Sequence, residues 1–483
     1  MPISLKNLAG WLPAILLFVG VLLWEPFPEQ VSANRVLAIG LAMIWLWVSE
    51  VTPMPVVALL PLVLFPLLKI CGIEEAAAPY ANPVVFLFLG GFLIGLAIEK
   101  WNLHTRIALT IVKFTGTSGN RIVLGFILAA GLLSMWLSNT ATTIMMYPIA
   151  LSVIHVMEKS YKGPGKPHYL AICLLMSIAY ASNFGGIATI IGTPPNVAFI
   201  AFIEKKYGFT YPFLDWMLLC MPIALLLMWT LYIVLTKVLY RNGMKSHPET
   251  DAFIQEQVRA LGPLSPNERK VLYVFVGTAF LWIFRDVINN LQTVIKLDDT
   301  LIAMAGGLSL FIIPSSKEKE QLLIWKDTEK MAWGILLLFG GGISLANQLE
   351  KAGLIEIAGK WMASSAGDNL FLLVFLIAVA SIFISEIMSN VAQVIVFAPV
   401  IAGMADVMQI NPLLLGVPLT LGASCASMLP MGTPPNAIVF ASGRLRLSDM
   451  LKTGLVMNLI AIVLITLFSY YLLPVITSSW PST

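Results

Sequence analysis

Long apolar runs separated by short polar stretches make up most of the chain. Each run approaches the roughly 20 apolar residues that a helix needs to cross the hydrocarbon core of a membrane. The strands of an outer-membrane barrel would instead give short segments of alternating polarity. The pattern therefore predicts an all-α polytopic membrane protein with about 11 transmembrane helices, near residues 10–28, 35–52, 53–70, 84–113, 168–202, 214–240, 268–286, 298–314, 331–350, 411–442 and 449–475.

Two further apolar segments, near residues 121–155 and 369–405, are about 35 residues long, which is more than one crossing needs. A polar triplet interrupts each near its middle: Ser138-Asn139-Thr140 in the first and Ser389-Asn390-Val391 in the second. A helical hairpin that enters and leaves on one side of the membrane explains both the length and the interruption. Because non-helical backbone at membrane depth must be buried in protein or line a cavity, we expect two re-entrant helical hairpins inside the bundle.

The two triplets have matching surroundings. Downstream of the first, Gly192-Thr193-Pro194-Pro195-Asn196 recurs letter for letter at residues 432–436. Glycine pairs lie equally far upstream of the two triplets, and prolines equally far downstream: Gly90-Gly91 and Gly341-Gly342, Pro148 and Pro399. The chain is therefore predicted to be a duplicated unit.

The basic residues predict how the two units are oriented. With a cytoplasmic N-terminus and two re-entrant hairpins, about 21 of the 29 Lys and Arg residues face the cytoplasm and about 8 face outward, as the positive-inside rule requires. The first hairpin then opens to the inside and the second to the outside, which is an inverted repeat. Such repeats form substrate and ion sites near the midplane from broken helices. Residues 241–267, the longest polar stretch, are expected to be a solvated cytoplasmic connector between the halves.

Composition excludes several classes of function. The chain is 58% hydrophobic and only 11% charged, against about 25% charged residues in soluble domains. Its net charge of +3 is spread over short loops, so no nucleic-acid partner is expected. The four cysteines and four histidines lack ligand or disulfide spacing, and no organic cofactor is expected. The triplet serines have no His or Lys base in either repeat's core, so we do not expect an enzyme.

The triplets supply ligands for a small cation. A hairpin tip leaves backbone carbonyls and amides without helical partners, and Ser and Asn add hydroxyl and amide oxygens. Ser134 and Ser385 precede the triplet serines by four residues. They are expected on the same helical face, one turn away, where each could add an oxygen.

The Pro-Pro segments complement the triplets. Two prolines remove two N–H donors and force a helix to open, which frees carbonyls near Gly192 and Gly432 for a cation. Half-helices beginning near Asn196 and Asn436 would point their positive N-terminal ends at the same region and favour an anion. Each repeat is thus predicted to offer a cation seat beside an anion seat.

The lack of charged residues in these motifs indicates that cation binding and anion binding are coupled. None contains Asp or Glu, which suits a monovalent cation better than calcium or magnesium. None contains Lys or Arg either, so bound cations would balance an anion, and each ion would favour the other's binding. Glu386, where the first repeat has Met135, is a functional candidate as an intramembrane carboxylate, or it pairs or caps near the hairpin tip. Glu50 is expected at the membrane interface.

Together these motifs resemble the divalent anion/sodium symporter family, the di- and tricarboxylate transporters that include bacterial proteins nicknamed INDY. Paired SNT-type triplets on opposed hairpins, each followed by a Pro-Pro break, carry the resemblance, which extends over essentially the whole chain. It implies a homodimer in the inner or plasma membrane, with scaffold and transport domains that move as an elevator. It also implies sodium-driven uptake of C4-dicarboxylates such as succinate, fumarate and malate.

The resemblance further implies residue roles. The first sodium site would comprise Ser134, Ser138, Asn139 and Gly192, and the second Ser385, Ser389, Asn390 and Gly432. The substrate carboxylates would meet Asn139, Thr140 and Asn390, with Val391 beside them, above a floor shaped by Pro194, Pro195, Pro434 and Pro435. The division would be 1–113 (N-terminal helices, mainly scaffold), 114–240 (first hairpin, broken helix and following span), 241–267 (connector), 268–350 (second scaffold helices) and 351–483 (second hairpin, broken helix and last span).

One position departs from the family pattern. Val391 stands where the fuller pattern has Thr, so one carboxylate has one donor fewer, which leaves substrate range open. Some members of the family exchange anions without sodium, so a sodium-independent dicarboxylate exchanger is an alternative. An ion channel is a further alternative suggested by the re-entrant hairpins, although two separate, opposed hairpins argue against a continuous pore.

Overall fold

The computed structural model describes residues 5–160, 166–208, 211–245, 248–292, 294–316, 320–366 and 369–476. Within these ranges the chain is all-helical, and extended pairing is limited to a bridge between Pro314 and Gln321. Eight helical stretches there are long and apolar enough to cross a membrane: Val31–Ser49, Ile73–Lys100, Asn139–Lys159, Pro167–Gly186, Phe213–Leu239, Pro266–Leu291, Asn390–Met408 and Leu447–Val475. The prediction of an all-α polytopic membrane protein is confirmed.

Both interrupted segments form pairs of helices, and in each pair the second helix begins at the asparagine of the triplet. The first repeat contains α8 (Gly119–Ser134), α9 (Asn139–Ser160), α10 (Pro167–Gly186), α11 (Pro194–Tyr207) and α12 (Phe213–Ile233). The second contains α18 (Leu370–Ser385), α19 (Asn390–Met408), α20 (Leu413–Ala423), α21 (Pro434–Phe440) and α22 (Leu447–Leu467). Hairpin 1 below means α8 and α9, and hairpin 2 means α18 and α19. Break 1 means residues 187–193, and break 2 means residues 424–433.

The remaining helices frame these two groups. They are α1 (Leu5–Trp24), α2 (Val31–Ser49), α3 (Met54–Val57), α4 (Leu60–Leu67), α5 (Ile73–Ala77), α6 (Pro83–Lys100), α7 (Leu103–Thr115), α13 (Pro248–Ala260), α14 (Pro266–Leu291), α15 (Asp299–Ser309), α16 (Trp333–Lys351), α17 (Leu354–Ala366) and α23 (Leu473–Ile476).

Several boundaries differ from the sequence prediction. The segment expected at 84–113 is two helices, α6 and α7, because Asn102 between them has a left-handed backbone with φ of 56°. The span expected at 53–70, which contains four prolines, is divided into α3 and α4. The helix α17 lies outside every predicted segment. The apolar pattern predicts which segments are helical. It does not predict where each helix ends, because local turns of the backbone determine the ends.

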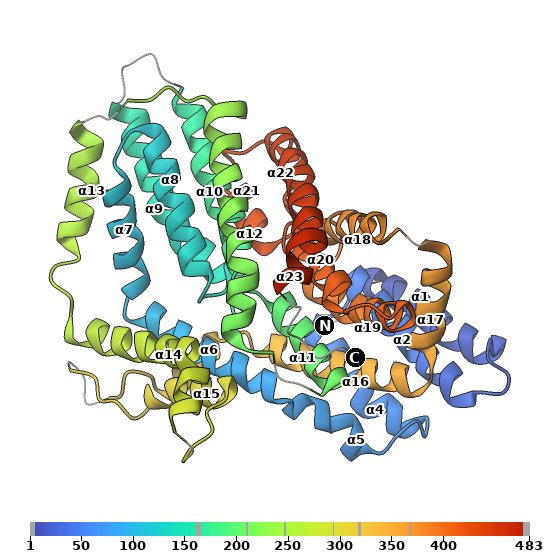
Figure 1. The fold of residues 1–483 in the computed structure, drawn as a ribbon. Helices are drawn as coiled ribbons and strands as arrows, with labels where there is room; N and C mark the ends of the chain where they lie inside the picture. Colours follow the sequence, from blue (N-terminus) through green and yellow to red (C-terminus); the bar gives the residue numbers. More distant parts are fainter. Residues whose placement is uncertain are drawn as a thin grey trace.

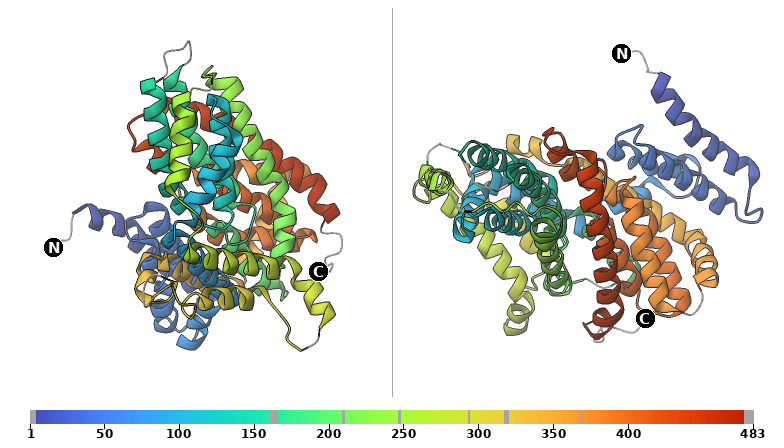
Figure 2. Two further views of the ribbon diagram at one scale, coloured as in Figure 1. Left: turned by 90° about the vertical axis from the view of Figure 1, so that its left-hand side faces the viewer. Right: turned by 90° about the horizontal axis from the view of Figure 1, so that it is seen from above.

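Hairpin 1 and α10 pack together as an upright body in Figure 1, while α6, α14, α15 and α16 lie across its base. Seen from above, α22 runs between that body and the second hairpin (Figure 2), in contact with α12, α18 and α20. The half-helices after the breaks cross between repeats: α11 packs on α19, and α21 packs on α9 and α10. The two repeats therefore share one interior.

The connector is more ordered than a solvated linker. It contains α13, which packs against α7 and α9. Beyond α13, the Arg106 guanidinium of α7 donates to the carbonyl oxygens of Leu261 (3.0 Å) and Gly262 (2.9 Å) and to the Glu268 carboxylate (2.9 Å). A guanidinium offers five donors in a fixed fork, so this one side chain fixes the chain where it enters α14.

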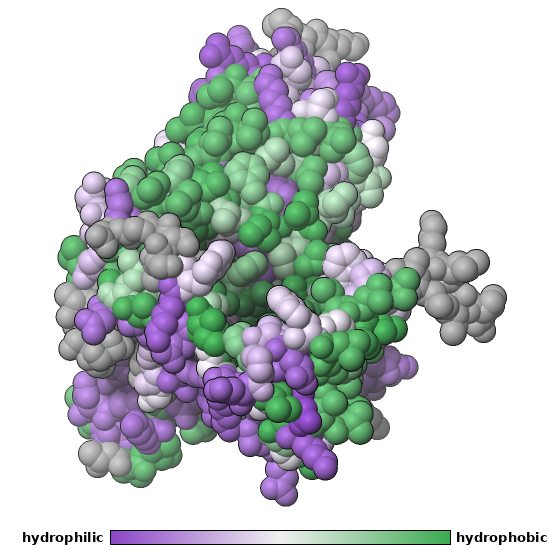
Figure 3. Space-filling view, turned by 90° about the vertical axis from the view of Figure 1, so that its right-hand side faces the viewer, coloured by the Kyte–Doolittle hydropathy of each residue, from purple (hydrophilic) through white to green (hydrophobic). Residues whose placement is uncertain are grey.

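The molecular surface carries apolar side chains where a bilayer would contact it. On α22, Leu455, Leu459 and Val463 lie one turn apart and are 42%, 52% and 53% exposed, whereas Met457 and Ile465 on the same helix are buried. The face in Figure 3 is largely apolar over the upper body, with hydrophilic residues gathered at its top edge. Exposed apolar stripes of this kind are unfavourable in water and are consistent with contact with lipid.

Candidate functional site

The two triplets and the two breaks form the region that we call the polar centre. In hairpin 1, α8 ends at Ser134 and α9 begins at Asn139. Ser134 Oγ lies 2.7 Å from the Asn139 side-chain amide, and Ser138 Oγ accepts a hydrogen bond from Ala141 N (3.2 Å) at the start of α9. The assigned helix α8 ends at Ser134, and the hydroxyl of that serine contacts Asn139, the residue that follows Ser138.

Break 1 is tied to the tip of hairpin 1 by Thr189. Its hydroxyl donates to the Met135 carbonyl of the tip and accepts a hydrogen bond from Gly192 N (3.0 Å). Pro194 and Pro195 occupy the first turn of α11, with Thr193 as N-cap. The half-helix therefore begins two residues before Asn196, because proline fits the first turn of a helix, where no N–H partner is needed.

Oxygen atoms gather around Asn139. One terminal atom of its amide lies 2.7 Å from Ser134 Oγ, 3.1 Å from Ser182 O and 3.2 Å from Gly192 O. A nitrogen there donates to all three groups, whereas an oxygen there would face acceptors only, so the nitrogen occupies this place. The serine hydroxyl and the two backbone carbonyls gathered around the amide are neutral oxygens. Three of the four residues predicted for the first sodium site, Ser134, Asn139 and Gly192, are thus in mutual contact, while Ser138 Oγ caps α9.

Glycine is needed at two of these positions. A Cβ on Gly192 would lie 2.5 Å from Gly186 O and 2.9 Å from Ser134 O, and a Cβ on Gly186 would lie 2.4 Å from the Asn139 amide. Those distances are below normal contact, so only glycine lets the backbone of break 1 approach the hairpin so closely.

In hairpin 2 the same contact recurs. Ser385 Oγ lies 2.7 Å from Asn390 Oδ1 and 2.6 Å from Ala423 O. Ser389 is the N-cap residue of α19. A Cβ on Gly432 would lie 2.9 Å from a carboxylate oxygen of Glu386. Ser385 and Asn390 are therefore together at the tip of hairpin 2, and Gly432 lies beside Glu386.

Glu386 holds break 2 in place. Its Oε1 accepts hydrogen bonds from the backbone amides of Ser427 and Met428 (both 2.8 Å) and from Asn458 Nδ2 (2.7 Å). Its Oε2 accepts one from Leu429 N (2.9 Å). The sequence left open whether Glu386 caps or acts directly; it does cap the freed amides of the opened backbone.

The asparagines that end the two pentapeptides hold the breaks open. Asn196 Nδ2 donates to the carbonyl oxygens of Gly186 (3.4 Å), Ile187 (3.1 Å) and Thr189 (2.8 Å). Asn436 Nδ2 makes the equivalent contacts in the second repeat, to Ala426 O (3.4 Å) and Leu429 O (3.1 Å). Both side-chain Oδ1 atoms are buried without a hydrogen-bond partner. Each repeat therefore keeps a buried acceptor oxygen beside its break.

The two repeats are joined at this level. Asn183 of α10 donates through Nδ2 to Thr433 Oγ1 of break 2 (3.1 Å), and the Tyr180 hydroxyl donates to Ser427 O (2.6 Å). Together with the crossed packing of α11 and α21, these bonds unite both triplets and both breaks in one buried region.

The remaining predicted residues line this region. Thr140 and Val391 are half-buried, Pro195 and Pro435 are buried, and Pro194 and Pro434 are the first residues of α11 and α21. A hollow of about 100 Å³ lies beside the first triplet, and Ser138, Trp136, Glu99 and Lys330 are among the residues that line it.

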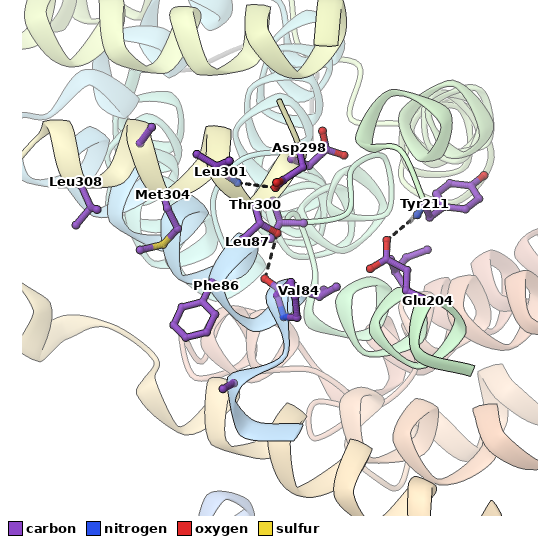
Figure 4. A pocket seen from close by; sticks show the side chains of 15 residues that line it. Val84, Phe86, Leu87, Glu204, Tyr211, Asp298, Thr300, Leu301, Met304 and Leu308 are labelled. Carbon is purple, nitrogen blue, oxygen red and sulfur yellow. Dashed lines mark hydrogen bonds between the residues drawn. The ribbon is translucent and has the colours of Figure 1, made fainter. Parts of the chain in front are cut away.

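A much larger hollow, of about 760 Å³, lies away from both triplets, between α6, α11 and α15. Figure 4 shows its polar end, where Glu204 accepts a hydrogen bond from Tyr211 N and Asp298 caps α15 through Leu301 N. Its other walls include Phe86, Leu87 and Met304. None of the predicted ligands lines this hollow, so the polar centre is the candidate site.

Sequence reasoning missed several residues of the polar centre. Asn196 and Asn436 were treated only as helix starts, although their recurrence in identical pentapeptides was a usable signal. Thr189 and Asn183 had no repeated counterpart: the equivalent positions are Leu429 and Ala423. Only the three-dimensional arrangement assigns them a role.

Comparisons with known proteins find similarity along nearly the whole chain. The family model described as the sodium:sulfate symporter transmembrane region matches residues 6–477. A sodium-dependent dicarboxylate transporter, SdcS, of Staphylococcus saprophyticus is 37% identical over 478 residues, covering 98% of this chain and 92% of its own. The protein of the same name in Staphylococcus aureus (strain USA300) is 36% identical over 482 residues, covering 98% and 93%.

Solved structures share the fold at low identity. The YdaH transporter of Alcanivorax borkumensis superposes with a TM-score of 0.57 at 14% identity, covering 84% of this chain and 88% of its own. MtrF of Neisseria gonorrhoeae, from a class of antimetabolite efflux pumps, gives a TM-score of 0.59 at 13% identity, covering 84% and 85%. These two likenesses concern the fold alone.

The role of Asn196 and Asn436 in holding the two breaks open can be tested by replacing each with alanine. Asn196→Ala and Asn436→Ala each leave break carbonyls without a donor, at about 1–3 kcal/mol per buried group. Transport per folded molecule should fall about tenfold or more in either variant, measured as uptake normalised to the monodisperse protein in gel filtration. Asn34→Ala is the matched control, because Asn34 is a buried asparagine whose side chain bonds to the backbone of Phe27, outside the polar centre. Unchanged uptake in both break variants would remove the bracing role.

Proposed function

The chain belongs to the sodium:sulfate symporter family, and from that premise we propose that it is a sodium-coupled symporter of C4-dicarboxylates such as succinate, fumarate and malate. It works in the inner or plasma membrane as a homodimer with a cytoplasmic N-terminus. The relatives named sodium-dependent dicarboxylate transporters, aligned over 98% of the chain, support the assignment. The observation that carries it is the group of neutral oxygens around Asn139.

A sodium ion suits that group. The surrounding atoms are a serine hydroxyl and the carbonyl oxygens of Ser182 and Gly192, with no carboxylate among them. Divalent cations are usually held by carboxylates, so a neutral shell favours a monovalent ion. Ser385, Asn390 and Gly432 form the second cation site of the proposal, with Ser138 and Ser389 completing the two sets at the helix starts.

A dicarboxylate suits the space between the two cation sites. Helices α9, α11 and α19 each begin at the polar centre, and the positive ends of helices favour carboxylates. Asn139, Thr140 and Asn390 supply side-chain donors to the two carboxylates. Val391 supplies none, and the prolines of the two pentapeptides form the floor.

Coupling follows from charge. The triplets and pentapeptides contain no Lys or Arg, and two carboxylates without compensating charge would be strongly disfavoured in a dry interior. Bound sodium ions supply that compensation, so substrate binds well only when the cation sites are filled. In the elevator movement that we propose, hairpin 1, α10, hairpin 2 and α20 travel together against the helices across the base of Figure 1.

Sodium coupling is tested in proteoliposomes. An inward sodium gradient should drive accumulation of labelled succinate, whereas an equal potassium gradient should not. Uptake that ignores the sodium gradient and appears only in vesicles preloaded with dicarboxylate would replace symport with exchange. Large single-channel currents in planar bilayers would replace both with a channel.

The triplet asparagines provide the test of the site. Asn139→Ala and Asn390→Ala each remove a cation oxygen and a substrate donor, so uptake should fall to background while the protein still elutes as a folded species. Near-normal uptake by either variant would show that the site lies elsewhere.

Val391→Thr restores a hydroxyl beside the second carboxylate. A hydrogen bond to a charged group contributes about 1.5–3 kcal/mol, so the variant should bind at least one dicarboxylate about tenfold more tightly, or change the order of preference among dicarboxylates. Competition of unlabelled anions against labelled succinate measures this. An unchanged inhibition profile would place residue 391 out of contact with substrate.

A further inference from the structure

The carboxylate of Glu386 is a buried group that the proposed mechanism has not used. Glu386 is 4% exposed and follows Ser385 at the tip of hairpin 2. All its hydrogen-bond partners, three backbone amides of break 2 and Asn458 Nδ2, are donors. This is the environment of an ionised carboxylate, which can only accept.

No side-chain cation in the described part of the chain forms an ion pair with this carboxylate. Within the described ranges of the chain, none of the ion pairs includes Glu386. A buried charge is ordinarily paired or coordinates a metal ion. The partner of this carboxylate is therefore expected to be something that the chain itself does not provide.

The first repeat shows that joining the tip of a hairpin to the neighbouring break does not require a charged side chain. The position equivalent to Glu386 is Met135, and there the tip of hairpin 1 is joined to break 1 by the neutral contact from Thr189 Oγ1 to the Met135 carbonyl. Both repeats thus tie tip to break, but only the second does so with a carboxylate. Tethering alone does not account for the acidic residue.

The carboxylate also lies against the second cation site. A Cβ on Gly432 would be 2.9 Å from Glu386 Oε2, and Ser385 precedes Glu386 in the chain. Opposite charges attract strongly over such short distances in a low-dielectric interior. A cation among Ser385, Asn390 and Gly432 would feel this charge, whereas one in the first site has no equivalent carboxylate at residue 135.

We propose that Glu386 is a positioning residue whose fixed negative charge makes the second cation site the tighter of the two, so that sodium fills the second site before the first. The order rests on the proposed sodium-coupled function. The first sodium ion then balances the charge of Glu386 in the second cation site. The next sodium ion binds in the first site together with the substrate.

Charge removal tests the strength of the second site. In Glu386→Gln the half-activating sodium concentration for succinate uptake should rise about tenfold, equivalent to about 1.4 kcal/mol. Glu386→Asp retains the charge and should need clearly less sodium than Glu386→Gln. If Glu386 were only a tether, the maximal rate or the folded yield would fall while the sodium dependence stayed unchanged. That result overturns the inference and leaves the proposed function intact.

Site-specific protection tests the order of filling without altering Glu386. Thr140 and Val391 occupy equivalent, half-buried positions in the two triplets, and Cys71 is the half-buried native cysteine, the other three being buried. In a Cys71→Ser background, labelling of Val391→Cys by a small thiol reagent should be half-blocked at a lower sodium concentration than labelling of Thr140→Cys. Equal concentrations, or the reverse order, overturn the inference even if Glu386→Gln fails to fold. Wild-type uptake that is indifferent to sodium would instead overturn the proposed function itself.

Discussion

The structure depends on hydrogen-bond partners for backbone N–H and C=O groups that lie outside regular helix in the apolar interior of the bundle. Two helices are interrupted by Pro-Pro segments, and two hairpins turn at polar triplets, all within an apolar bundle. Each unpartnered backbone group in such a setting costs several kcal/mol. The chain meets that cost with side chains from neighbouring segments: Asn196 and Asn436 hold break carbonyls, Thr189 joins tip to break, and Glu386 accepts three break amides. The side-chain Oδ1 atoms of Asn196 and Asn436 remain buried without a hydrogen-bond partner, and a ligand can use them.

The repeated motifs were readable from sequence because they break a strong background pattern. A polar triplet or a Pro-Pro pair inside a long apolar run is conspicuous, and each recurs once, in the same order, in the second half of the chain. That was enough to predict the helical hairpins, the broken helices and the pairing of Ser134 with the first triplet. It was not enough to say which triplet atom Ser134 contacts, because that depends on α8 ending at Ser134, and apolar composition does not encode the end of a helix.

Contacts between distant segments were beyond sequence reasoning for a different reason. Thr189, Asn183 and Tyr180 lie in apolar surroundings where an isolated hydroxyl or amide is unremarkable. Their roles arise from packing that places α10 against break 2 and α21 against α9. The same holds for α13, since a polar, proline-bearing stretch reads as linker until Arg106 on another helix fixes its far end.

The crossed packing bears on how the polar centre could move. Each half-helix after a break rests on the hairpin of the other repeat, and Asn183 bonds to Thr433 across the boundary. Sliding one hairpin alone would break either the bond from Thr189 to the Met135 carbonyl or the bonds from the break 2 amides to Glu386, and would leave these buried groups without partners. Moving both hairpins with both broken helices preserves every one of these bonds. The hydrogen bonds that satisfy the non-helical backbone therefore favour movement of the polar centre as one rigid body. They oppose gating by either hairpin on its own.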